Sequence, residues 1–244
     1  MAGSSQEVGV GEKLNLSSSK RLTLVGIIAI LLCVLILVVW RLQQYRWVDR
    51  SIITGMPCAP PCWQGITPGV TQMDEALEIL SNSPYIETGS IKRAGTDISG
   101  GCTWRWRSPG RRMQPGLNWQ TGIVDTIQMG LTFNLTVQEV TDKFGLPEAV
   151  SAVEGGQPEH WYWIIVLHYP SQGVEFKAYT SEFSKDIKPT TEVGAVLLFS
   201  PLTMDERIKE IEKGLSSPLP IDYFSDWKGY GDVAELYGGG RQWP

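Results

Sequence analysis

An uncharged apolar run near the N-terminus constrains this chain more than any other feature of its sequence. The run extends from Leu22 to Trp40, and basic residues flank it on both sides, namely Lys20, Arg21, Arg41 and Arg46. A helix that crosses a bilayer core needs about 20 apolar residues, and basic and aromatic residues typically flank it. The sequence therefore predicts one transmembrane helix over residues 20–41, with a lipid bilayer in contact with residues 22–40.

A cleaved signal peptide and a lipoprotein signal are the two alternatives for this run. The run is longer than the apolar region of about 7–15 residues in a signal peptide, and no small-x-small cleavage site follows it. A lipid-attachment signal would place a small residue before its cysteine, whereas Leu31 and Leu32 precede Cys33. The sequence therefore favours an uncleaved membrane anchor.

The orientation of this helix is not decided by its basic residues, which are balanced on the two sides. The short polar tail of residues 1–19 is easily left in the cytoplasm, and the cysteines of the remaining chain favour an oxidising compartment. We therefore expect a single-pass protein of the cell membrane with a cytoplasmic N-terminus and an extracytoplasmic C-terminal domain.

Three cysteines follow the apolar run, and they are candidates for a disulfide. Cys58-Ala-Pro-Pro-Cys62 has the wrong spacing for a C-x-x-C redox motif, and Cys102 follows later. A metal site would need further ligands, but His160 and His168 stand at no metal-binding spacing. The sequence predicts a structural disulfide, in which Cys58–Cys62 and a bond from one of them to Cys102 both remain open. We expect no metal.

The sequence also carries no recognisable catalytic motif. It lacks G-x-S-x-G, a phosphate-binding P-loop, G-x-G-x-x-G after a strand and H-E-x-x-H. His160 and His168 begin and end an expected strand, and neither has an identifiable partner for general-base chemistry. The net charge of −5 gives no basic excess for nucleic acid. We expect neither enzymatic activity, nor a cofactor, nor a nucleic-acid partner.

Helix and strand signals alternate along the rest of the chain. Capping boxes at Thr71–Asp74, Thr136–Glu139 and Thr203–Glu206 each precede an amphipathic run. Alternating or apolar β-type segments follow the first two of these helices, at 102–107, 123–133, 148–153, 160–169, 174–180 and 193–200. A helix followed by antiparallel strands, occurring twice, predicts an α+β fold.

The expected fold is one N-terminal transmembrane helix followed by two tandem helix-plus-antiparallel-sheet units. These units would form two small layers of helix on sheet, with one continuous sheet through both as a variant. The expected boundaries are a disordered tail over 1–19, the transmembrane helix over 20–41, a juxtamembrane connector over 42–57, a first α+β unit over 58–133, a second over 134–202, and a C-terminal helix with an aromatic-rich tail over 203–244.

One motif resembles a known group of proteins. Pro61-Cys-Trp-Gln-Gly-Ile-Thr-Pro-Gly69 is similar to a motif of uncharacterised membrane-anchored or lipid-anchored bacterial proteins, and the similarity extends to Phe144–Glu148 and Tyr169–Phe176. More distantly, the pattern resembles the small outer-membrane-assembly lipoproteins of the SmpA/OmlA (BamE) family and the β-lactamase-inhibitor-protein (BLIP) fold, a tandem of such units. The resemblance implies a bacterial protein of this fold without catalytic residues. An outer-membrane role does not carry over, because the lipobox is missing.

Arginine and tryptophan are concentrated in one segment of this acidic chain. In Trp104-Arg-Trp-Arg107, strand alternation would place the two indoles on one face and the two arginines on the other. The indole face could be core with solvated arginines opposite, or the segment could be an interaction surface, since tryptophan and arginine are common hot-spot residues. The candidates for that surface are Arg105, Arg107, Arg111, Arg112 and Trp119.

The sequence therefore leads to two hypotheses of function. The first is a non-catalytic, single-pass membrane-anchored, extracytoplasmic protein-interaction module, such as an accessory subunit of a larger membrane complex. The alternative is an extracytoplasmic sensory domain that binds a small ligand or a glycan through its aromatic residues.

Overall fold

The computed structural model describes residues 18–45, 48–108, 113–157, 160–181, 184–215, 219 and 223–237. Contacts between residues divide the chain into two compact units, Met1–Arg46 and Trp47–Pro244. Most of the tail that we expected to be disordered, residues 1–17, lies outside the described residues.

The first unit contains a single described helix, α1 (Ser18–Tyr45). Its described side chains run from residue 25 to residue 40, and the large apolar ones among them are exposed. Within the described part of the chain, no helix is both long and apolar enough to cross a membrane. This finding contradicts the predicted transmembrane helix over residues 20–41.

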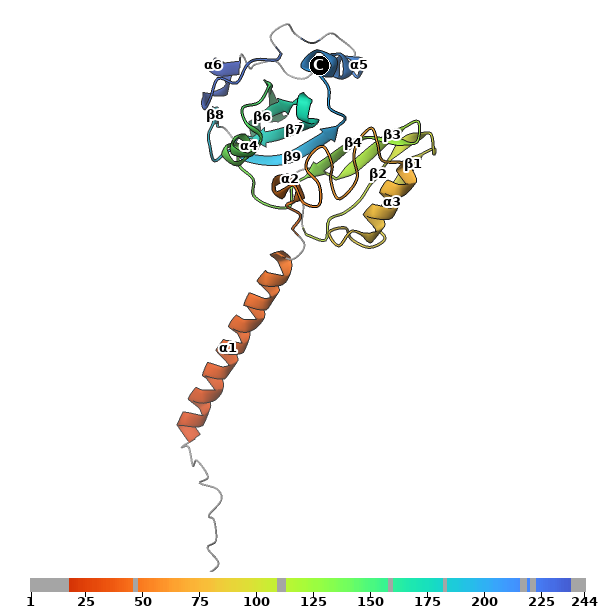
Figure 1. The fold of residues 1–244 in the computed structure, drawn as a ribbon. Helices are drawn as coiled ribbons and strands as arrows, with labels where there is room; N and C mark the ends of the chain where they lie inside the picture. The colour runs from red at the N-terminus through yellow and green to blue at the C-terminus, as the bar shows by residue number, and fades with distance from the viewer. Residues whose placement is uncertain are drawn as a thin grey trace, which may run out of the picture. The chain divides into compact units, whose positions relative to one another are not determined.

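The second unit is built on one antiparallel sheet of eight strands (Figure 1). Its strands are β1 (Lys92–Gly95), β2 (Ser99–Thr103), β3 (Gly116–Gln120), β4 (Ile123–Gly130), β5 (Ala149–Gln157), β6 (His160–Tyr169), β7 (Val174–Tyr179) and β9 (Glu192–Phe199). Their order is β1-β2-β3-β4-β9-β7-β6-β5, so that β9 joins the two halves. A small second sheet pairs β8 (Asp186–Ile187) with β10 (Gly231–Asp232).

The prediction of two tandem units is therefore wrong in its architecture. The two helix-then-strands segments do not form separate layers, because β4 of the first segment pairs along its length with β9 of the second. The fold is a mixed α/β arrangement around one continuous antiparallel sheet. In two separate sheets, β4 and β9 would each be an edge strand with unpaired backbone N–H and C=O groups. Pairing β4 with β9 removes both edges.

The remaining helices are short. They are α2 (Ser51–Thr54), α3 (Met73–Asn82), α4 (Val137–Phe144), the 3₁₀ turn η1 (Pro170–Gln172), α5 (Met204–Lys213) and α6 (Val233–Tyr237). Thr136 and Thr203 form the predicted capping boxes of α4 and α5. The predicted box at Thr71 is wrong: its hydroxyl accepts a hydrogen bond from the Thr67 amide, and α3 starts after Gln72 without a side-chain cap.

One face of the sheet, the inner face, packs against α3 and α4. Phe144 of α4 lies against Phe176 of β7, with ring centroids 4.9 Å apart. Met73, Ala76 and Leu80 of α3 are buried in the same apolar cluster. The sheet face opposite these helices is called the outer face below.

Candidate functional site

The outer face is defined by a row of residues that crosses all eight strands. The cross-strand partners along this row are Lys92, Thr103, Gly116, Gln128, Leu197, Glu175, His168 and Ala149. Residues directly opposite each other in neighbouring strands point to the same side of a sheet. The row therefore places a polar end on β1–β4 and a charged end on β5–β7 on one surface.

The middle of the outer face carries apolar side chains that the core does not bury. Tyr162, Ile164 and Val166 of β6 and Leu197 of β9 are all half-buried, and none belongs to the apolar core cluster. Lys177 of β7 is the half-buried cross-strand neighbour of Val166. We call Tyr162, Ile164, Val166 and Leu197 the central patch. A sheet with one face packed and one face open normally alternates apolar with polar residues, and the central patch departs from that pattern.

The β1–β4 end of the outer face is hollow. A cavity of about 430 Å³ lies there, lined by Lys92, Gly101, Gln114, Gly116, Asn118 and Gln128 among others. The Asn118 side chain donates a hydrogen bond to the Thr126 hydroxyl at 3.2 Å, which fixes one wall. We call this cavity the glycine-floored hollow.

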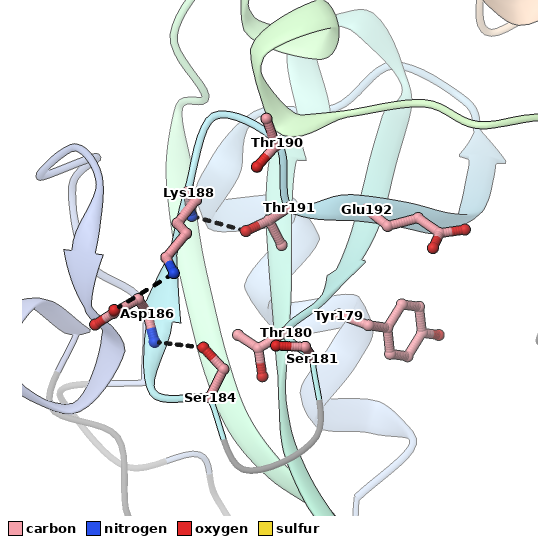
Figure 2. A pocket seen from close by; sticks show the side chains of 9 residues that line it. All are labelled: Tyr179, Thr180, Ser181, Ser184, Asp186, Lys188, Thr190, Thr191 and Glu192. Atoms are coloured by element: carbon pink, nitrogen blue, oxygen red, sulfur yellow. Dashed lines mark hydrogen bonds and ion pairs between the residues drawn. The ribbon is translucent and has the colours of Figure 1, made fainter.

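A second, smaller pocket lies where β7 ends and β9 begins. Its volume is about 300 Å³, and hydroxyl-bearing side chains dominate its lining (Figure 2). Tyr179 and Glu192 are cross-strand partners and point the same way, away from Asp186 (Figure 2). The Tyr179 ring lies 6.0 Å from the ring of Tyr162, so the pocket adjoins the central patch. The polar lining suits a neutral hydroxylated ligand better than an apolar one.

A buried hydrogen-bonded chain occupies the β5–β7 end of the outer face. The Ser151 hydroxyl lies 2.8 Å from His168 Nε2, and His168 Nδ1 lies 2.9 Å from Glu175 Oε1. Arg207 of α5 donates to both oxygens of Glu175, at 2.7 and 3.0 Å. Ser151, His168 and Glu175 are each at most 3% exposed.

The ionisation of Glu175 follows from these contacts. Burial alone would raise the pKa of this carboxyl group, but hydrogen bonds and charges from His168 and Arg207 outweigh that effect and lower the pKa to about 2. A buried carboxylate that accepts a bidentate arginine remains charged at neutral pH. The network therefore holds α5 on the sheet through a charged pair.

The C-terminal segment covers this network. Tyr223 hydrogen-bonds Ser151, and the Phe224 ring stands edge-on to His168 with centroids 5.2 Å apart. Ser225 then pairs with Val150 on the edge strand β5, through backbone hydrogen bonds of 2.7 and 2.9 Å. A serine, a histidine and a carboxylate in this order could move a proton between them. In this structure Ser151 is buried beneath the covering segment, so its hydroxyl group is not open to solvent.

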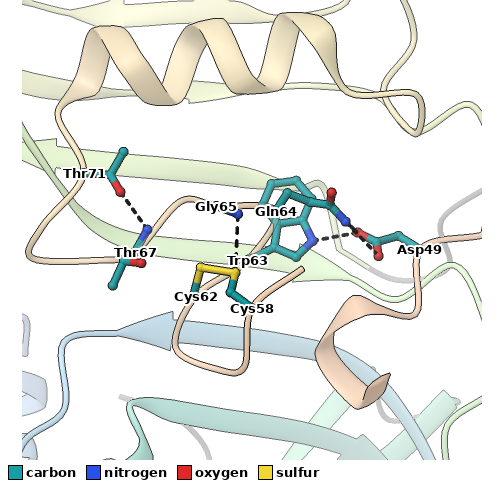
Figure 3. The surroundings of a disulfide bond; sticks show 8 residues. All are labelled: Asp49, Cys58, Cys62, Trp63, Gln64, Gly65, Thr67 and Thr71. Carbon is teal, nitrogen blue, oxygen red and sulfur yellow. Dashed lines mark hydrogen bonds between the residues drawn. A yellow bond between two sulfur atoms is a disulfide. The ribbon is translucent and has the colours of Figure 1, made fainter. Parts of the chain in front are cut away.

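The predicted disulfide is present in the loop before α3. Cys58 and Cys62 are bonded (Figure 3). Cys102 is a free, buried thiol. Burial raises the pKa of Cys102 to about 11, against smaller lowering effects of the Leu117 backbone and Arg93. The open alternative of a bond to Cys102 is therefore not the one that the structure adopts.

The disulfide loop is fixed to the rest of the second unit by one tryptophan. Trp63 Nε1 donates to Asp49 at 2.6 Å, and the Trp63 ring stacks on Trp104 with centroids 5.7 Å apart (Figure 3). Trp106 stands edge-on to both rings. The buried Trp63, directly after the disulfide, thus anchors the partly exposed loop to the core, which suits a structural disulfide.

The arginine and tryptophan candidates occupy several different positions. Arg105 and Arg107 are exposed, but each is engaged: Arg105 pairs with Glu87 at 2.9 Å, and Arg107 donates to the Ile86 carbonyl at 2.9 Å. Trp119 is 1% exposed and belongs to the core, so it contributes no exposed surface. Arg111 and Arg112 lie outside the described residues. The three described candidates, Arg105, Arg107 and Trp119, therefore do not share one open surface.

Sequence reasoning did not identify the outer face or its buried network. The sequence offered no identifiable partner for His168, whereas in the structure Glu175 faces it across the β6–β7 hairpin. The pairing of His168 with Glu175 could have been predicted from the hairpin turn. A turn at Pro170–Gly173 pairs Tyr169 with Val174, and counting outward from that pair places His168 opposite Glu175. The row that reaches β9 and β4 joins residues far apart in the chain, and no local pattern reveals it.

Comparisons of the chain with protein-family models, with curated proteins and with solved structures found no match. The resemblance to the SmpA/OmlA and β-lactamase-inhibitor-protein folds therefore rests on the sequence motifs alone. The described residues contain no group of three or more histidine, cysteine, aspartate or glutamate side chains that could hold a metal ion.

Proposed function

We propose that the second unit is a non-catalytic protein-interaction domain that docks a partner protein on its outer face. The observation that carries this proposal is the central patch, in which Tyr162, Ile164, Val166 and Leu197 remain partly exposed in the middle of a sheet. Apolar and aromatic residues surrounded by polar ones are typical of the centre of a protein interface.

The surroundings of the central patch support the same reading. Lys177 and Gln128 flank it with polar groups, and both are only half-buried. The patch is carried on regular strands that pair on both sides, so its side chains are held in fixed positions. A preorganised surface loses little conformational entropy when a partner binds.

An extracytoplasmic location and contact with a lipid bilayer belong to the same proposal. The Cys58–Cys62 disulfide supports the location, because such bonds persist in oxidising compartments. The location is tested by trapping free thiols in intact cells and mapping the peptides. Finding both Cys58 and Cys62 reduced would contradict an extracytoplasmic location. The exposed apolar side chains of α1, from Val25 to Trp40, support the lipid contact, because large apolar patches are rarely left in water.

Site-specific crosslinking would test the docking surface. A photoreactive phenylalanine analogue at Ile164, in the central patch, is expected to form adducts with one partner protein in the native host. The matched control places the same analogue at Lys143, an exposed residue of α4, which packs on the inner face. Adducts from Lys143 but not from Ile164 would refute the proposed surface.

Substitutions would then measure the contribution of the patch. Tyr162→Ala is expected to weaken capture of the crosslinked partner by at least about 30-fold, the effect of losing a hot-spot residue worth about 2 kcal/mol. Its melting temperature should stay close to that of the wild type, because the ring is not part of the core cluster. Unchanged capture by a well-folded variant would exclude the central patch as the docking site.

The hydroxyl-lined pocket favours a second candidate function, the binding of a neutral sugar or similar polyol. The pocket holds about 300 Å³ and contains Asp186 and Glu192 as acceptors for ligand hydroxyl groups. Titration of the purified chain with neutral mono- and disaccharides, followed by saturation-transfer NMR, separates the two functions. Saturable sugar binding without any crosslinked protein would favour this second candidate.

A further inference from the structure

The glycine-floored hollow has a chemical character of its own at the β1–β4 end of the outer face. Its floor is formed by Gly101 of β2 and Gly116 of β3, which are both on the outer face. A Cβ atom added at Gly101 would lie 2.6 Å from the Asn118 side-chain oxygen. One added at Gly116 would lie 2.9 Å from the Cys102 carbonyl oxygen. The hollow therefore exists because these two positions have no side chain.

Hydrogen-bond donors surround this floor. Gln114, Asn118 and Gln128 contribute three carboxamide groups, and Lys92 contributes an ammonium group. The Asn118 NH₂ group already donates to the Thr126 hydroxyl and retains one further N–H, whereas the Gln114 and Gln128 carboxamides can each present an NH₂ group to an acceptor. Among the described residues that line the hollow, none is an aspartate or a glutamate. In a chain with a net charge of −5, a cavity with donors and a cation but no carboxylate is electrostatically distinct.

Lys92 and Arg93 are the two cations among the described residues that line the hollow, and of these Lys92 is available to a ligand. Arg93 forms an ion pair with Asp97 and lies over the Trp119 ring, with its guanidinium carbon 5.4 Å from the centroid. Lys92 forms no ion pair with a described residue, and its side chain is exposed on the outer face. A single ammonium group with amide donors matches one negative charge better than the two charges of a phosphate ester.

We propose that the glycine-floored hollow receives the side-chain carboxylate of a glutamate or aspartate on the docked partner protein. This inference rests on the proposed function and names the anchor by which the partner binds. The volume of about 430 Å³ accommodates such a side chain together with its own backbone. Gln128 faces Leu197 across the β4–β9 pair, so the hollow continues directly into the central patch.

A pair of matched probes tests the carboxylate directly. The full-length chain, purified in mild detergent and labelled with ¹⁵N in its asparagine and glutamine side chains, is titrated with N-acetyl-glutamate N-methylamide and with the corresponding glutamine compound. The glutamate probe is expected to shift the side-chain signals of Asn118 and Gln128 and to bind about fivefold more tightly than the glutamine probe, the effect of one exposed ion pair. Equal affinity for the two probes, or no shifts with either, would overturn the inference.

Variants show whether the hollow itself is responsible. Lys92→Gln should abolish the preference for glutamate, while Lys143→Gln on α4, an exposed lysine on the other side of the sheet, should preserve it. Gly101→Ala should weaken both probes, because the added methyl group fills the floor and moves the Asn118 side chain. A preference that survives Lys92→Gln would contradict the assigned site.

Partner capture separates this inference from the proposed function. If Tyr162→Ala loses the crosslinked partner while Lys92→Gln and Gly101→Ala retain it fully, the docking surface stands and the carboxylate anchor is refuted. If the Ile164 crosslink fails, the proposed function fails, but the two probes still report on the hollow. An outcome in which Lys92→Gln weakens capture and Lys143→Gln does not supports both.

Discussion

Glu175 is the residue whose ionisation contributes most clearly to stability. Its pKa lies at about 2 in the folded chain, against an ordinary value of 4.5. Because the folded pKa is the lower one, the stabilisation is fully present above about pH 4.5 and is lost as the pH falls from 4.5 towards 2. The size of the shift corresponds to about 3 kcal/mol of unfolding free energy.

We therefore predict that Glu175→Gln lowers the free energy of unfolding at pH 7 by about 3–5 kcal/mol, because the mostly buried Arg207 loses its buried bidentate counter-ion and keeps only the exposed carboxylate of Glu210. The variant should also lose part of the acid sensitivity of the wild type between pH 4.5 and 2. Melting temperatures across that range measure both effects. Glu78→Gln, at an exposed position of α3, is the control and should leave the pH profile unchanged. A profile for Glu175→Gln that parallels the wild type would contradict the assigned pKa.

At the scale of elements, the segment after β2 separates what neighbouring residues could predict from what depends on distant contacts. Alternation correctly separated the buried Trp104 from the exposed Arg105 and Arg107. Strand β2 ends at Thr103, before the segment begins. The β-type pairing of Trp106 is limited to an isolated bridge with Ile86. The partners of the arginines come from the turn after α3, which no spacing within the segment indicates.

This segment yields a prediction with two opposed outcomes. Trp104→Ala is expected to lower the free energy of unfolding by about 3–5 kcal/mol, because it leaves a cavity next to Trp63 and Trp106. The double change Arg105→Ala and Arg107→Ala removes exposed contacts and should cost about 1 kcal/mol or less. Urea denaturation of both variants measures the difference. A double variant as unstable as Trp104→Ala would show that the arginines, and not the indoles, hold this segment in place.

For the whole molecule, local signals identified elements but not their assembly. The capping boxes at Thr136 and Thr203 follow from neighbouring residues and could be predicted. The presence of a disulfide could be predicted too, but the sequence left open whether the bond was Cys58–Cys62 or involved Cys102. The insertion of β9 between β4 and β7 depends on contacts between distant segments, and this insertion turns two expected units into one sheet. The outer face could not be predicted from the sequence for the same reason, because the row of residues that defines it forms only when β9 lies between β4 and β7.

The division of the chain into two compact units supports a last prediction, which concerns the whole molecule. All contacts that form the eight-stranded sheet and its core lie in the unit that starts at Trp47. A chain that begins at Trp47 should therefore unfold in one transition within about 2 °C of the full-length chain, since losing 1 kcal/mol would shift the midpoint by about 2–4 °C. The same truncation removes the exposed apolar side chains of α1, so flotation on a sucrose gradient should recover the full-length chain with membranes and the truncated chain without them. Flotation of the truncated chain would assign the lipid contact to the second unit instead, and a lowered melting temperature would show that α1 stabilises the sheet.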